Sequence, residues 1–144
     1  MIRSALAGAG MLFLVCAGVT LAATPPSGPP FPAPINDVVV YDYAEILSPQ
    51  TEAAATNIIV AIESRVGAEM VVYTQYKPGS DDESTDADAL ALINQWGVGR
   101  RGIDDGLAIM WNTNREECLS GVSGNGRVRL YAAPGYAAVY ASND

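Results

Sequence analysis

Short apolar runs that alternate with helical patterns constrain the fold of this chain more than any other feature. The runs lie at 38–41, 68–74, 107–111 and 127–131, and the first three are apolar along most of their length. Apolar residues at helical spacing fill the intervals 48–66 and 85–96. Strands that alternate with helices and are apolar throughout are typical of a parallel sheet covered on both faces.

We therefore expect an α/β fold: a Rossmann-like three-layer α/β/α sandwich with a mainly parallel sheet, in the order β-α-β-α-β-β. The crossovers between parallel strands should be right-handed. The first helix should begin at Ser48 and Pro49, a capping serine followed by proline at the first helical position, and end at Gly67. Thr85 and Asp88 resemble a capping box at the start of the second helix.

The first 23 residues have the pattern of a secretory signal peptide, with a positive start, an apolar centre and small residues near Ala22 and Ala23, where we expect cleavage. A retained membrane anchor and a lipoprotein modified at Cys16 are the alternatives. Residues 24–35 contain six prolines in twelve positions and predict a semi-rigid spacer. We expect residues 36–144 to form one domain of an exported protein, extracytoplasmic in the cell envelope, a periplasm-like space or the medium.

Composition excludes several kinds of chemistry. The chain has no histidine, so it has no Ser-His-Asp triad, no Cys-His dyad and no His-ligated metal. Its formal net charge of −8 argues against nucleic acid as a partner, because phosphate binding needs a basic face. The glycines at 121–126 precede no helical pattern, so we expect no nucleotide cofactor. Cys118 would be the single cysteine after signal removal and predicts a small buried side chain.

Two motifs resemble those of TPM domains. Residues 39–48, VVYDYAEILS, are similar to that family's opening V-x-D-x-A-x-x-L-S, and residues 96–107, WGVGRRGIDDGL, to its W-G-I-G-x-x-G-x-D/N-D/N-G-L segment. The family includes thylakoid-lumen proteins of photosystem II repair, a levamisole-receptor modulator and many exported bacterial proteins. The resemblance covers about residues 37–136. After Tyr136 the match is loose, so we expect a TPM domain that is incomplete at its C-terminus and lacks the family's last helices.

The resemblance implies an α/β/α sandwich, and calcium binding or acid phosphatase activity as described for some members. By position, the acidic residues carried over as metal ligands are Asp42, Asp104 and Asp105, with Ca²⁺ as the cofactor. Calcium takes six to eight oxygen ligands, which three carboxylates, backbone carbonyls and water can supply. The alternative is that Asp104-Asp105-Gly106 is only a turn into a strand.

Two function classes follow. We favour an exported interaction or assembly module whose partners are envelope or membrane proteins, with or without bound calcium. The alternative is a metal-dependent acid phosphatase, a phosphomonoester hydrolase. Arg100 and Arg101 are the candidates for stabilising phosphate charge, because only there do cations adjoin acids in a flexible Gly-rich loop. The two arginines are equally consistent with exposed loop cations, and no residue has dedicated catalytic spacing.

Overall fold

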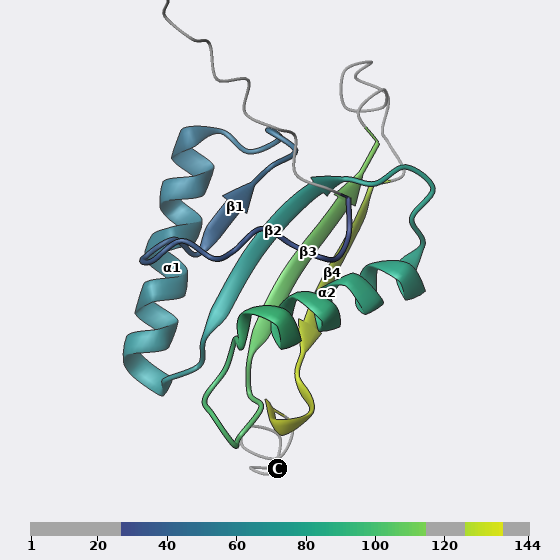
Figure 1. Cartoon of the computed structure of the whole chain (residues 1–144). Coiled ribbons are helices and arrows are strands. Elements are labelled where there is room, and N and C mark those ends of the chain that lie inside the picture. Colours follow the sequence, from purple (N-terminus) through teal and green to yellow (C-terminus); the bar gives the residue numbers. More distant parts are fainter. Residues whose placement is uncertain (1–26, 115–125, 137–144) are drawn as a thin grey trace, which may run out of the picture.

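The structure, a computed structural model, describes residues 27–114 and 126–136. A four-stranded sheet has the order β1-β2-β3-β4, in which the first three strands are parallel and β4 is antiparallel to β3 (Figure 1). This confirms the α/β fold with a mainly parallel sheet. The elements are β1 (Val40–Asp42), α1 (Pro49–Val66), β2 (Met70–Tyr76), α2 (Asp82–Trp96), β3 (Leu107–Thr113) and β4 (Arg127–Ala132).

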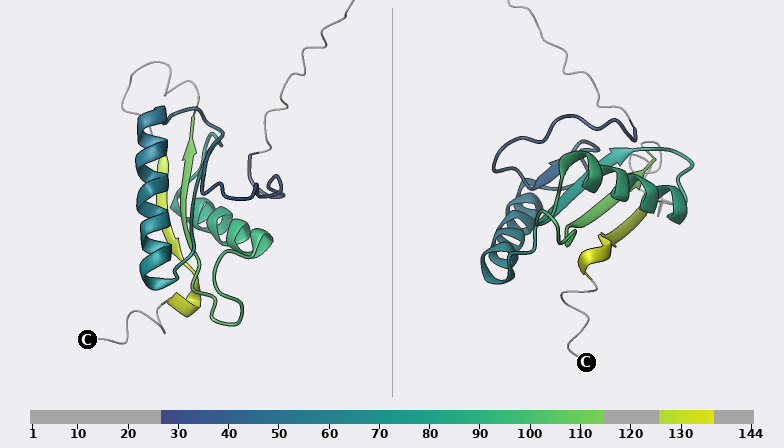
Figure 2. Two further views of the ribbon diagram at one scale, coloured as in Figure 1. Left: turned by 90° about the vertical axis from the view of Figure 1, so that its left-hand side faces the viewer. Right: turned by 60° about the horizontal axis from the view of Figure 1, so that its bottom comes forward.

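The two helices lie on opposite faces of the sheet and give the predicted three layers (Figure 2). On the α2 side, Leu92 and Ile93 of the helix pack with Tyr73 of β2 and Met110 of β3 in the main buried cluster. On the other side α1 contacts β1 and β2, and Ile59 is its one fully buried side chain among the described residues. The larger core therefore lies between α2 and the sheet.

The crossovers differ from expectation. β1, β2 and β3 follow one another across the sheet while α1 and α2 lie on opposite faces, so the two crossovers have opposite hands. The prediction that both are right-handed is wrong for one of them. The α2 face over β1 and β2 is already occupied, because Phe31 packs on Tyr73 and Trp96 packs on Tyr41. Helix α1 packs on the other face of β1 and β2.

Helix ends follow local capping chemistry. The Ser48 side chain accepts a hydrogen bond from the backbone N–H of Thr51, and Gly67 ends α1 with a φ of 71°, both as predicted. The start of α2 differs from the prediction: Asp81 is the N-cap, and its carboxylate and the Ser84 hydroxyl form the reciprocal capping box. The predicted Thr85–Asp88 box is therefore wrong, because Asp88 is buried inside the helix.

The proline-rich segment differs from a free spacer along most of its length. Phe31 is only 4% exposed and belongs to the main buried cluster. Residues 28–35, called the strap below, cross the sheet on the same side as α2 (Figure 2). The packed unit thus begins before the predicted boundary at residue 36.

One face of the sheet is open. On the side opposite α2, α1 covers β1 and β2, but no element among residues 27–114 and 126–136 covers β3 and β4 (Figure 2). Leu130 is 65% exposed there and Val128 is 50% exposed. The described helices include none with the length and apolarity needed to span a membrane. The predicted signal peptide, Cys118 and the residues after Tyr136 lie outside the described residues.

Candidate functional site

Asp105, one of the predicted metal ligands, is fully buried in the Gly-rich loop that enters β3. Its Oδ1 accepts a hydrogen bond from the Arg100 backbone N–H at 2.8 Å, and its Oδ2 accepts one from Arg100 Nε at 2.7 Å. These bonds and the nearby guanidinium charge hold the pKa of the Asp105 carboxyl below its usual range. Both oxygens therefore serve to close the loop.

The glycines of this loop allow a close approach of the backbone. A methyl group at Gly106 would lie 2.2 Å from the carbonyl oxygen of Val98, and one at Gly99 would lie 2.5 Å from the Gly106 nitrogen. A methyl group at Gly135 would lie 1.4 Å from the carbonyl oxygen of Ile103. Gly99 and Gly106 of the 96–107 motif are thus required by the close packing of the loop backbone.

Asp42 ends β1 and folds the turn that follows. Its Oδ1 accepts hydrogen bonds from the Ile46 backbone N–H at 3.2 Å and from Thr74 Oγ1 at 2.5 Å, and its Oδ2 accepts one from the Leu47 N–H at 2.8 Å. The Thr74 hydroxyl oxygen also accepts a hydrogen bond from the N–H of the fully buried Ala44 at 3.0 Å. The aspartate, alanine and leucine of the first motif are therefore tied together as a turn.

The structure does not bring the three predicted ligands together. Asp42 pairs with Thr74 and lies level with Trp111, whereas Asp105 precedes Leu107 at the other end of β3. Four residues of strand separate Trp111 from Leu107, which is about 13 Å, and a calcium ion lies only about 2.4 Å from its ligands. Asp104 is exposed beside Asp105. Within the described residues, no group of three His, Cys, Asp or Glu side chains is placed to hold a metal ion.

The two predicted phosphate-binding arginines differ in their surroundings. Arg100 forms the ion pair with Asp105, at 2.5 Å between Nη2 and Oδ2, whereas Arg101 is exposed. Both line a hollow of about 440 Å³ between the loop and the end of α2, with Asp104 at its rim. Of these two arginines, Arg101 is therefore the better candidate to bind an incoming anion.

A buried polar cluster that sequence reasoning missed lies at the carboxyl ends of β2 and β3. Asp88 Oδ2 accepts hydrogen bonds from Gln75 Nε2 at 3.1 Å and from Asn112 Nδ2 at 2.9 Å. Lys77 Nζ lies 2.6 Å from the same oxygen. Gln75 and Asn112 are partners in the strand register. In the sequence, an amide side chain after each of the two apolar runs was the signal that could have indicated this cluster.

A pocket adjoins this cluster and is called the carboxyl-edge pocket. It has a volume of about 240 Å³ and is lined by Lys77, Ser80, Asn112, Asn114 and Arg127, among others. Ligands of α/β sheets bind beyond the carboxyl ends of the strands, and this pocket lies there with two cationic side chains. Its chemistry suits a small anion.

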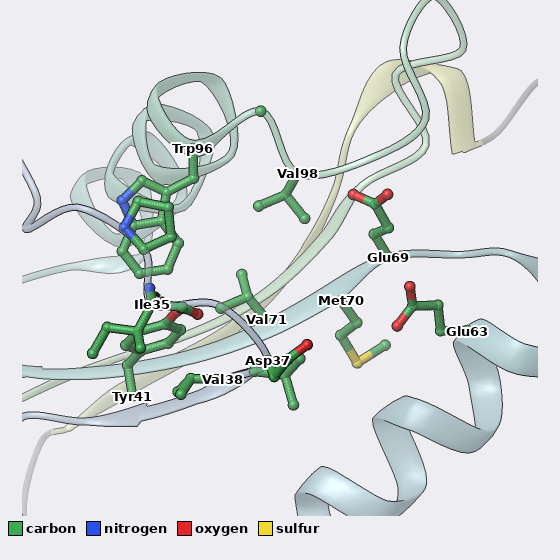
Figure 3. A pocket seen from close by; sticks show the side chains of 13 residues that line it. Ile35, Asp37, Val38, Tyr41, Glu63, Glu69, Met70, Val71, Trp96 and Val98 are labelled. Atoms are coloured by element: carbon green, nitrogen blue, oxygen red, sulfur yellow. Dashed lines mark hydrogen bonds between the residues drawn. The ribbon is translucent and has the colours of Figure 1, made fainter.

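A second hollow, the strap pocket, lies at the amino ends of β1 and β2 and has a volume of about 290 Å³. Figure 3 shows Tyr41, Trp96 and Ile35 at one end and the carboxylates of Glu63 and Glu69 at the other. The Glu69 carboxylate accepts a hydrogen bond from the Gly99 N–H at 2.8 Å. The pocket thus has an end lined by aromatic and aliphatic side chains and an acidic end.

Fold and motifs together define an α/β/α domain whose two signature segments hold its turns and loops in place. The family model for the TPM domain matches residues 40–130 of the chain. The chain therefore belongs to the TPM domain family, as its two motifs predicted. A search of the curated proteins found no match.

Proposed function

We propose that this chain is an exported TPM-domain protein that acts as an interaction or assembly module for membrane protein complexes in the cell envelope. The signal-peptide pattern of residues 1–23 supports export. The acidic side chains of the family motifs, Asp42 and Asp105, have their oxygens engaged by the protein itself. This arrangement favours a binding function over a catalytic one at these positions.

The observation that carries the proposal is the open apolar face of β3 and β4, called the β3/β4 face. Every second residue of the two strands points to this side, and none of these seven side chains is charged. In a chain of net charge −8, an exposed apolar patch free of charge marks an interaction surface. The occupant that fits is an apolar segment of a membrane protein. The seven residues are Leu107, Ile109, Trp111, Thr113, Val128, Leu130 and Ala132. Leu107 and Thr113 are buried, and the other five are exposed or partly exposed.

The test is photocrosslinking in intact cells. A photoreactive amino acid at position 130 of the full chain should crosslink to a membrane protein, and the same amino acid at the exposed position 50 on α1 should not. In a chain with the photoreactive group at position 128, Leu130→Lys should abolish the crosslink, because burying an unpaired ammonium in an apolar interface is unfavourable. Crosslinks to a second copy alone, or none at all, would overturn the proposal.

A phosphomonoester hydrolase is the second candidate, and the carboxyl-edge pocket is the observation that favours it. Arg127 lies 3.6 Å from an oxygen of Asp82, and its Nε has no hydrogen-bond partner among the described residues. Lys77 supplies a second cation on the pocket wall. Hydrolysis of p-nitrophenyl phosphate that disappears in Lys77→Met and Arg127→Met, but persists in Leu130→Lys, would favour this candidate. The assay is run with and without calcium.

A further inference from the structure

The strap is held in an unusual way for a segment of the core. Gln95 clamps the backbone of one residue, since its Oε1 accepts a hydrogen bond from the Phe31 N–H at 2.9 Å and its Nε2 donates one to the Phe31 carbonyl at 2.6 Å. Trp96 Nε1 donates to the Pro32 carbonyl at 2.9 Å. Side chains of α2 thus bind the backbone of the strap.

The two ends of the strap are held by the same kind of contact. The Gly28 N–H donates to Gln75 Oε1 at 2.9 Å. The Tyr41 hydroxyl lies 3.0 Å from the Ile35 nitrogen and 3.2 Å from the Ile35 carbonyl oxygen. Proline-rich segments have no internal hydrogen bonds, so their backbone groups are free for such contacts. Contacts of this kind require an extended backbone.

A single large side chain anchors the strap. Phe31 is 4% exposed and meets the Tyr73 ring edge to face, with ring centroids 5.2 Å apart. Pro29, Pro30, Ala33 and Pro34 around it are exposed. The strap therefore shares with recognised proline-rich peptides an extended backbone and an aromatic-lined groove, but its buried anchor is a phenylalanine and not a proline.

The aromatic residues under the strap contact one another as well as the strap. Tyr41, Tyr73 and Trp96 pack on one another, with ring centroids 4.6 Å apart for Tyr41–Trp96 and 5.7 Å for Tyr73–Trp96. The family match begins at residue 40, after the strap ends. The strap pocket continues the groove beside Ile35 and is unfilled (Figure 3). The strap therefore rests on aromatic side chains that also pack on one another, and a hollow beside Ile35 is left unfilled.

We propose that this groove, formed by Gln95 and Trp96 of α2 with Tyr41 and Tyr73 of the sheet, is a binding site for an extended proline-rich protein segment with an aromatic anchor. Its own strap occupies the groove in cis, and a segment of the same kind from another protein replaces it in trans. The groove lies on the face of the sheet opposite the β3/β4 face, so this proposal stands or falls separately from the proposed function.

The test uses the full chain and a peptide of residues 24–36. In a Trp111→Phe background, Trp96 is the only remaining tryptophan of the two, and its fluorescence reports on the groove. Phe31→Ala should release the strap, and this chain should bind the peptide saturably and at least about tenfold more tightly than the chain that keeps Phe31, because a tethered strap competes at millimolar effective concentration. A peptide with alanine in place of phenylalanine should not bind.

Variants inside and outside the groove test whether the peptide binds there. Gln95→Ala should weaken peptide binding about tenfold, the cost of one backbone clamp, whereas Gln50→Ala on exposed α1 should leave it unchanged. Leu130→Lys should also leave it unchanged, which separates this result from the test of the β3/β4 face.

The outcome is decided even where Phe31→Ala does not fold. The chain with Phe31 is then titrated with millimolar peptide and followed by amide chemical shifts, and saturable shifts at Gln95 and Trp96 support the proposal. Absence of saturable binding to a folded Phe31→Ala chain, or equal affinity for the alanine peptide, would overturn it. An unfolded Phe31→Ala chain together with no shifts in the Phe31 chain would also overturn it, since the strap would then be a fixed part of the core.

Discussion

The contact between Asp105 and Arg100 ties stability to pH at the scale of one residue. Asp105→Asn should lower the free energy of unfolding at neutral pH by about 2 kcal/mol, because it removes charge-assisted hydrogen bonds from a fully buried position. The pKa of Asp105 is lowered in the folded protein, so the unfolded chain takes up the proton first as the pH falls. This stabilisation is therefore present above about pH 4 and is lost below it.

Urea denaturation between neutral and acid pH measures this effect. The protein with Asp105 should lose more stability on acidification than Asp105→Asn. Asp104→Asn is the matched control, because Asp104 is exposed and its φ of 55° is one that asparagine tolerates. Equal losses in the Asp104 and Asp105 variants would contradict the assignment of a structural role to Asp105.

At the scale of elements, Asp88 holds α2 against β2 and β3. Its Oδ2 is shared by Lys77, Gln75 and Asn112, and its side chain is 5% exposed. Asp88→Asn should lower the free energy of unfolding by about 3 kcal/mol, because it removes the negative charge that is paired with Lys77 and weakens the charge-assisted hydrogen bonds at this buried oxygen.

Asp86→Asn is the comparison on the same helix. Asp86 accepts two hydrogen bonds from Arg129 of β4, each at 2.8 Å, but this ion pair is partly exposed. Its loss should cost less than about 1 kcal/mol and should depend on salt. Urea denaturation of both variants gives the two values, and a cost for Asp86→Asn as large as that for Asp88→Asn would show that burial does not set the difference.

At the scale of the whole molecule, the response to calcium follows from the positions of Asp42 and Asp105, which lie at opposite ends of the parallel strands. One ion shared by both would add about 2.7 kcal/mol to the free energy of unfolding at 100 times its dissociation constant. We therefore expect that calcium causes no shift in melting temperature that depends on both Asp42 and Asp105. A shift abolished by Asp42→Asn and equally by Asp105→Asn, measured by calorimetry, would contradict the separation of the two sites.

Local signals in the sequence were enough for much of the fold. Apolar runs predicted each described strand to within about two residues, and Ser48, Pro49 and Gly67 predicted the ends of α1, because capping acts between residues that are neighbours in the chain. The two motifs identified the TPM domain, since their glycines and aspartates fold turns that are themselves local.

Only the tertiary structure decided which side chains meet. The sequence order of Asp42, Asp104 and Asp105 does not give the distances between them in the folded sheet. Asp42 follows the carboxyl end of its strand, whereas Asp104 and Asp105 precede the amino end of theirs, and in a parallel sheet these ends lie on opposite sides. The prolines of residues 24–35 predicted a spacer, yet Phe31 is buried, because α2 presents Gln95 and Trp96 to the strap across 64 residues of sequence. The buried Asp88 cluster and the open β3/β4 face arise in the same way, from packing between elements that are distant in the chain.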